Sequence, residues 1–111
     1  LYSSAASDVY KRQGEQFASA LGNKSVLVSR NHGVTVVGAT VAEAFYDLYY
    51  FELACKRQYF LATSGCKASV VPENMSARTR QAIDSEFATS AVLYFDALKR
   101  ELDREGSGYS A

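Results

Sequence analysis

The stretch that decides the fold spans residues 25–38 and reads SVLVSRNHGVTVVG. Two runs rich in β-branched residues, 26–28 and 34–37, flank Asn31-His32-Gly33. β-Branched residues favour strands, and a glycine can take the positive φ that a tight turn between two strands requires. The stretch therefore predicts a β-hairpin with one residue at positive φ in its loop. His32, the single histidine of the chain, is expected at or beside a strand end.

A long helix is predicted to follow over residues 40–63. Thr40 and Glu43 form a capping box, in which the threonine hydroxyl accepts a backbone N–H and the glutamate reaches back to another. Apolar side chains then recur at steps of three and four, as they do on one face of a helix. They are Val41, Phe45, Leu48, Cys55, Tyr59 and Ala62. Tyr46, Tyr49 and Tyr50 lie on the flanks, so we expect this helix to be covered on more than one side.

Glu52 falls inside that apolar stripe. An unpaired carboxylate there would carry a large desolvation cost, so a partner is expected. Lys56, one helical turn further on, or a basic group across an interface would make Glu52 part of a structural ion pair. A carboxylate that faces an active cleft is the functional alternative, and both interpretations stay open.

Further helices are predicted at residues 15–21 and from residue 75 or 76 to 104, the second after a connector with a short extended piece at 69–71. The apolar stripe of the second consists of Ile83, Phe87, Ala91, Val92, Phe95, Leu98 and Leu102. On its solvated face, two charge pairs are expected at four-residue spacing. They are Asp96 with Arg100 and Lys99 with Asp103.

The two ends of the chain are expected to lie outside the fold. Residues 1–13 show no periodicity that leads into the rest and look like a translated sequencing adapter, which predicts a non-native or disordered leader. Residues 106–111 predict a tail. The natural protein would then continue upstream of Leu1.

Composition excludes several classes of partner. Twelve basic residues balance twelve acidic ones, so no basic footprint for nucleic acid or an anionic membrane is present. No apolar run approaches the roughly 18 residues that a membrane span needs. Cys55 and Cys66 are too far apart for a Cys-x-x-Cys pair and too few for a disulfide framework. We therefore expect both thiols to be reduced, with Cys55 packed on a helix face. Reduced thiols are typical of the cytoplasm, which is the location we expect.

His32 is the candidate metal ligand. The sequence has no glycine-rich phosphate loop and no Gly-x-Ser-x-Gly elbow, which disfavours nucleotide binding and serine hydrolysis. Zinc and similar divalent ions take three or four ligands from His, Cys, Asp and Glu, and His32 can supply one of them. A hydrogen-bonded structural histidine is the alternative.

In their order and spacing these motifs resemble the class II aldolase/adducin family. The resemblance rests on a strand, Asn31-His32-Gly33, a strand that ends in Gly38, the helix start at residues 40–45 and ELACKRQ at 52–58. It covers residues 15–58 well, and the helix at 95–105 is similar but less specific. It implies an α/β fold, a partial three-layer α/β/α domain. Residues 14–105 would be the C-terminal part of that domain, and this part would consist of a β-hairpin and two long helices.

The resemblance also implies a function. Enzymatic members hold a divalent metal, usually zinc, with three histidines, one of which would be His32, presented by a loop that Asn31 and Gly33 shape. The family's His-x-His pair has no counterpart in these 111 residues, so the other ligands are expected outside the chain. The implied activity is that of a lyase, or a related epimerase or decarboxylase, on sugar phosphates or similar hydroxy-carbonyl substrates. The enzyme would be a homotetramer, and this fragment would be inactive alone. The alternative is an adducin-like, non-enzymatic protein that binds actin and spectrin.

Overall fold

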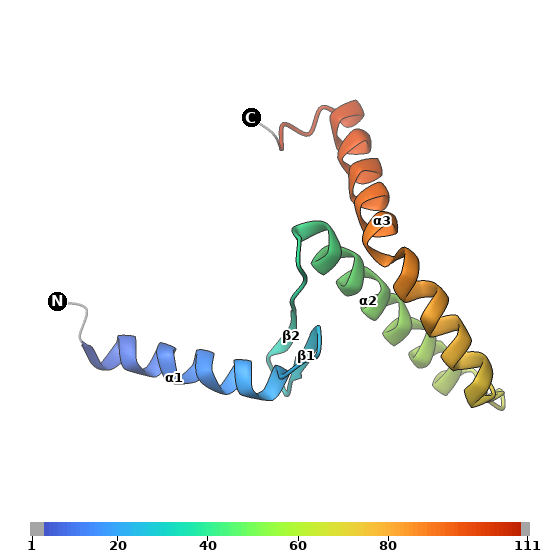
Figure 1. Ribbon diagram of the computed structural model, residues 1–111, viewed down its shortest axis with the longest axis horizontal. Helices are drawn as coiled ribbons and strands as arrows, with labels where there is room; N and C mark the ends of the chain where they lie inside the picture. The colour runs from blue at the N-terminus through green and yellow to red at the C-terminus, as the bar shows by residue number, and fades with distance from the viewer. Residues whose placement is uncertain (1–3, 110–111) are drawn as a thin grey trace. The chain divides into compact units, whose positions relative to one another are not determined.

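The computed structural model describes residues 4–109 and divides after Val37 into two compact units (Figure 1). The first unit contains one helix and a β-hairpin, and the second contains two long helices. The elements in chain order are α1 (Ser4–Leu21), β1 (Val26–Ser29), β2 (Gly33–Val36), α2 (Val41–Thr63) and α3 (Glu73–Glu105). This is a partial α/β domain, and its three-layer arrangement stays a prediction.

Helix α1 is longer than the sequence predicted. It ends at Leu21 as expected, where Gly22 takes φ 56° and donates its N–H to Ala18 O at 3.0 Å. It begins at Ser4 rather than near Glu15, however. Residues 4–13 lack an apolar stripe but include alanine, lysine, arginine and glutamine, which are good helix formers. The assignment of 1–13 to a leader outside the domain stays a prediction, and its residues 1–3 lie outside the described part.

The predicted hairpin is confirmed, with a loop one residue earlier than expected. Strands β1 and β2 pair antiparallel, from Val26 opposite Val36 to Ser29 opposite Gly33. The loop is Arg30-Asn31-His32, and the His32 N–H donates to Ser29 O at 3.1 Å. Two residues have positive φ instead of one: Asn31 at 57° and Gly33 at 153°. Asparagine tolerates the left-handed region better than most residues. The residues before and after His32 therefore both have positive φ, which turns the backbone there.

The capping box at the start of α2 is confirmed, with one change of partner. Thr40 Oγ1 accepts the N–H of Glu43 at 3.2 Å, as expected. The Glu43 carboxylate reaches one residue further back, and accepts the N–H of Ala39 at 3.2 Å instead of that of Thr40. The Glu43 N–H in the first helical turn and the Ala39 N–H just before the cap each gain an acceptor in this way.

Replacement of Thr40 with alanine is expected to lower the free energy of unfolding by about 1 kcal/mol, because the Glu43 N–H loses its acceptor. Urea unfolding followed by circular dichroism measures this change. The matched control is Thr40→Ser, which keeps the hydroxyl and should unfold within a few tenths of a kcal/mol of the wild type. Equal loss in both variants would show that the threonine methyl group, and not the cap, is responsible.

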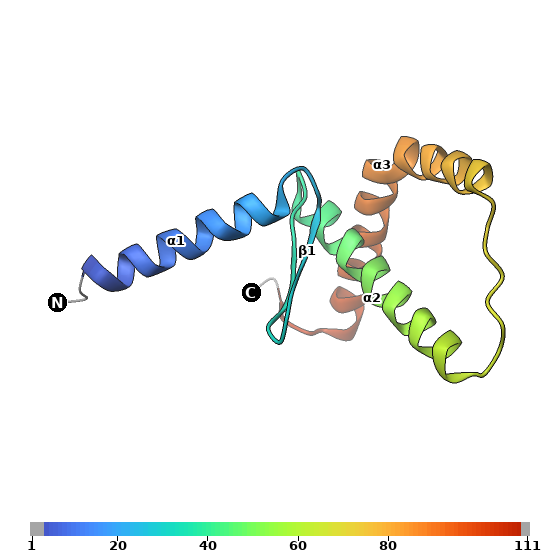
Figure 2. The ribbon, with the colours of Figure 1, turned by 90° about the horizontal axis from the view of Figure 1, so that it is seen from below.

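The second unit is held together where α2 and α3 cross. Ala91 of α3 is fully buried at this crossing and lets the helices approach. Around it lie aromatic pairs between the two helices, with ring centroids 5.0–6.4 Å apart. These pairs are Phe45–Tyr94, Phe45–Phe95, Tyr46–Phe87, Tyr46–Tyr94 and Tyr49–Tyr94. Beyond the crossing, the end of α2 and the start of α3 lie apart, joined by the connector at 64–72 (Figure 2).

The predicted apolar stripe of α2 is only partly buried. Its members nearest the crossing, Phe45 and Leu48, are each 38% exposed, whereas Val41 is 74% and Tyr59 68% exposed. Every residue from 54 to 86 is exposed, Cys55 included, which contradicts the expectation that Cys55 packs on a helix face. The bare apolar flanks of α2 differ from the expectation that this helix is covered on more than one side, because α3 contacts it only around the crossing.

Two predicted charge arrangements have changed. Glu52 is exposed instead of buried, and it pairs with Lys56 at 3.9 Å, one of the partners that the sequence left open. On α3, Lys99 pairs with Asp96 at 2.7 Å in place of Asp103, because the three-residue spacing brings the two groups together. This contact lowers the pKa of the Asp96 carboxyl and raises that of the Lys99 amine.

Helix α3 begins at Glu73, directly after Pro72 and two or three residues earlier than predicted. It ends at Glu105, and the cap residue Gly106 takes φ 64°. The Gly106 N–H donates to Asp103 O and the Ser107 N–H to Leu102 O, both at 3.2 Å, which is the Schellman pattern of helix termination. The predicted tail therefore begins with a defined helix stop, and its residues 110 and 111 fall beyond the described region.

Candidate functional site

His32 lies in the loop of the hairpin, directly before β2, and is exposed. Its backbone N–H is used by the turn, but no hydrogen bond or ion pair joins its imidazole to another residue between 4 and 109. A structural histidine would be expected to use its ring nitrogens in packing or hydrogen bonding. Among residues 4–109, the His32 ring is exposed to solvent and makes no such contact.

The sequence predicted that the residues on either side of His32 shape its loop. Gly33 at φ 153° has nothing within 4 Å of the position that a Cβ would take, so its constraint is conformational and not steric. Asn31 holds φ 57°, which is uncommon for a residue with a side chain. Asn31 and Gly33 thus both hold positive φ next to His32, and their role in presenting the His32 ring stays a prediction.

Residues 4–109 do not assemble a complete metal site among themselves. Over residues 4–109, no group of three or more His, Cys, Asp or Glu side chains is placed to hold an ion. The two thiols, Cys55 and Cys66, are free and exposed and belong to the other unit. Zinc needs three or four ligands, so a single imidazole fits such an ion only if further donors come from elsewhere.

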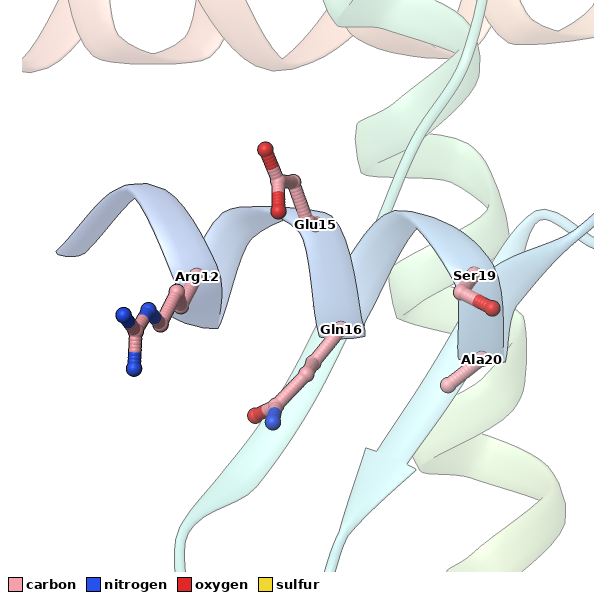
Figure 3. Close-up of a pocket in the computed structure, with 5 residues that line it drawn as sticks. All are labelled: Arg12, Glu15, Gln16, Ser19 and Ala20. Atoms are coloured by element: carbon pink, nitrogen blue, oxygen red, sulfur yellow. The ribbon is translucent and has the colours of Figure 1, made fainter. Parts of the chain in front are cut away.

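A shallow hollow on α1 does not make an alternative site. It has a volume of about 460 Å³ and is lined by Arg12, Glu15, Gln16, Ser19 and Ala20. All five residues come from one helix, and Glu15 points away from Arg12 and Gln16 (Figure 3). Binding and catalysis require polar groups that converge on one point, which these side chains do not.

A groove of about 520 Å³ lies on the helical unit, and is mostly apolar. Phe45 of α2 forms one side, and Phe95, Leu98 and Leu102 of α3 form the other. Tyr109 closes part of it, with its hydroxyl 3.5 Å from Lys99 O. Lys99, Glu101 and Glu105 also line the groove, which carries no histidine or thiol.

The crossing of α2 and α3 contains a tyrosine cluster that the sequence indicated only in part. Tyr46, Tyr49 and Tyr50 were expected on the flanks of α2, but their neighbour Tyr94 was left out of the predicted stripe of α3. Tyr94 lies next to Phe95 and seven residues, or two helical turns, after Phe87, and this spacing could have placed it on the apolar face of α3. Hydrogen bonding to Tyr50 and burial raise the pKa of Tyr46, and burial and the Tyr49 hydroxyl raise that of Tyr94.

These raised values predict that the helical unit loses stability in alkali. When the pKa of a tyrosine is higher in the folded than in the unfolded state, that tyrosine contributes to the free energy of unfolding. The contribution is complete below about pH 10, the ordinary pKa of tyrosine. This contribution is lost as the pH rises through the higher pKa of the folded state. We expect urea midpoints to fall over that range, as measured by circular dichroism. The fall should be smaller in the double variant Tyr46→Phe/Tyr94→Phe, and an equal fall would contradict this assignment.

None of the helices described between residues 4 and 105 is long and apolar enough to cross a bilayer.

Comparison with known proteins gives the family of the chain. Residues 2–59 match the family described as "Class II Aldolase and Adducin N-terminal domain", and this match includes most of the predicted leader. A Caulobacter vibrioides protein named "Putative aldolase class 2 protein" is 33% identical over 97 residues, which are 86% of this chain and 38% of that protein. A Pseudomonas aeruginosa protein of the same description is 28% identical over 93 residues, 80% of this chain and 36% of that protein.

Human β-adducin is 32% identical over 99 residues, which cover 77% of this chain and 14% of β-adducin. The chain thus spans well under half the length of each of these relatives. No solved structure matches it. The matched region contains the hairpin, His32 and most of α2, and it shows that the chain belongs to the class II aldolase and adducin family.

Proposed function

We propose that this chain is part of a divalent-metal-dependent lyase of the class II aldolase family. His32 supplies one ligand to the ion, zinc in the first instance, and the remaining ligands come from polypeptide outside these residues. The observation that carries the proposal is the exposed imidazole, without a partner among the described residues, in a loop that positive φ values at Asn31 and Gly33 hold in place.

The substrate class that we propose is sugar phosphates or similar hydroxy-carbonyl compounds. Divalent ions act as Lewis acids toward carbonyl oxygens, which is the chemistry that cleavage next to a carbonyl needs. The names of the two bacterial relatives support an aldolase. Residues 14–105 would form the C-terminal part of the domain, in a cytoplasmic homotetramer. The exposed apolar surface of α2, including Tyr59 and Phe60, would be covered by the rest of that assembly.

The test uses the protein as its gene encodes it, with any residues that adjoin these 111. Elemental analysis after zinc loading and dialysis should find stoichiometric zinc in that protein and none retained by the 111-residue chain. Treatment with a chelator should abolish cleavage of a panel of sugar phosphates, and added zinc should restore it. A protein that binds no divalent ion under these conditions would overturn the proposal.

The second candidate is an adducin-like, non-enzymatic role in binding actin and spectrin. The observation in its favour is that human β-adducin matches this chain at 32% identity, about as well as the bacterial relatives do. Co-sedimentation with actin filaments distinguishes the two functions. Filament binding by a metal-free protein would favour the adducin-like role, and metal-dependent cleavage without filament binding would favour the lyase.

A further inference from the structure

Four tyrosine rings form a closed circuit at the crossing of α2 and α3. The centroid of Tyr46 lies 4.7 Å from that of Tyr50, and Tyr50 lies 5.3 Å from Tyr49. Tyr49 lies 5.0 Å from Tyr94, and Tyr94 lies 5.8 Å from Tyr46. Three of the rings belong to α2 and one to α3, so the circuit spans the contact between the two helices.

We propose that this tyrosine circuit is a site of oxidative modification, where a one-electron oxidant joins Tyr49 to Tyr94 by a dityrosine bond and so links α2 covalently to α3. The inference does not depend on the proposed function, because it uses neither His32 nor a metal ion.

The geometry of the Tyr49–Tyr94 pair favours this bond. The two rings are tilted by 46° at 5.0 Å, and packing of the two helices holds them there. The Tyr49 hydroxyl lies close enough to that of Tyr94 to raise its pKa. Phenoxyl radicals couple at the ring carbons next to the oxygens, and the 5.0 Å separation of the two ring centroids brings the side chains within reach of such a bond. Tyr46 and Tyr50 lie on one helix, so their bond would not join the two helices.

In the 111-residue chain, an oxidant can reach this circuit from solvent. Tyr49 is 41% and Tyr50 47% exposed, while Tyr46 and Tyr94 are half-buried. The centroids of neighbouring rings in the circuit lie at most 5.8 Å apart, so a radical formed on an exposed ring can pass to the next one. The chain has no tryptophan to compete for it. The exposed thiols of Cys55 and Cys66 are the main competing reductants.

The reaction balances as the removal of two electrons and two protons from two phenols. Each tyrosine loses its hydroxyl hydrogen as an electron and a proton, and the two radicals form a carbon–carbon bond between positions next to the oxygens. The hydrogens on those carbons then move to the oxygens, which restores both phenols. The product lacks two hydrogen atoms: two equivalents of the one-electron oxidant take up one electron each, and the two protons go to solvent.

The experiment oxidises the full chain with photogenerated ruthenium(III) tris-bipyridyl and persulfate, at high dilution and in a Cys55→Ser/Cys66→Ser background. We expect dityrosine fluorescence in the monomer band of a denaturing gel. Mass spectrometry of the digest should find one peptide pair, containing Tyr49 and Tyr94, that is lighter by two hydrogen atoms. The oxidised monomer should also melt at a higher temperature, because the bond restricts the unfolded chain.

Matched variants test the assignment. Tyr94→Phe and Tyr49→Phe keep the ring packing and should each lose the monomer fluorescence. Tyr59→Phe changes a tyrosine that is 68% exposed and outside the circuit, and should leave the fluorescence unchanged. Urea melts of each variant before oxidation establish that it is folded.

Three outcomes would overturn the proposal. One is an equal yield of the Tyr49–Tyr94 bond in chain unfolded by urea, which would show that the fold contributes nothing. Another is a product dominated by bonds between chains. The third is a monomer product that joins Tyr46 to Tyr50 in place of Tyr49 to Tyr94, which would leave the two helices unlinked.

Discussion

Replacement of His32 with alanine is expected to leave the fold intact and to remove both bound metal and lyase activity from the gene-encoded protein. The fold should survive because the imidazole is exposed, and the hydrogen bond that closes the turn comes from the His32 backbone N–H, which alanine keeps. Loss of groups that only orient a metal ligand costs about 10–100-fold in metal affinity, so loss of a ligand should cost at least that much. Elemental analysis and a cleavage assay measure the two effects together.

The turn itself provides a control for this experiment. Asn31→Gly keeps the positive φ without a side chain, and should therefore preserve the presentation of His32 and the metal content. Urea unfolding should give the same midpoint for His32→Ala as for the wild type. Unchanged zinc stoichiometry in His32→Ala would remove His32 from the ligand set, even if activity fell.

The local elements of the fold could be predicted because their signals are contained in a few neighbouring residues. The hairpin follows from β-branched runs around a glycine, and the start of α2 follows from the hydroxyl of Thr40 and the carboxylate of Glu43. The start of α1 was missed because residues 4–13 show no apolar periodicity, so only helix propensity marks them.

Burial along α2 was predicted less well, because it depends on what surrounds the helix. The apolar pattern around Glu52 indicates a covered face, yet the described residues supply only α3, which contacts α2 near its start. The carboxylate therefore stays in solvent, and its pair with Lys56 is an exposed one, of the kind that contributes little to stability. The same reasoning applies to the candidate site, since the sequence could place His32 in a loop but could not place ligands that lie outside the chain.

Gly38→Ala is expected to lower the free energy of unfolding by about 1–3 kcal/mol, since it forces atoms into occupied space. A Cβ on Gly38 would lie 2.7 Å from Ala44 N and 3.2 Å from Ala44 Cα. Both are backbone atoms of the first turn of α2, so no side-chain rotation can relieve the contact. The glycine that ends the apolar run therefore lets the chain pass close to the start of the helix, which explains why this position suits glycine despite an ordinary φ.

Gly14→Ala is the matched control, with an effect of opposite sign. Gly14 lies inside α1, and a Cβ there would meet nothing within 4 Å. Alanine should favour α1 by about 0.5–1 kcal/mol, because it loses less backbone freedom in a helix than glycine does. Urea unfolding of the two variants separates a steric requirement for glycine from a general preference for alanine. A stabilised Gly38→Ala would show that the start of α2 moves to accept the methyl group, and that the close approach does not determine the residue.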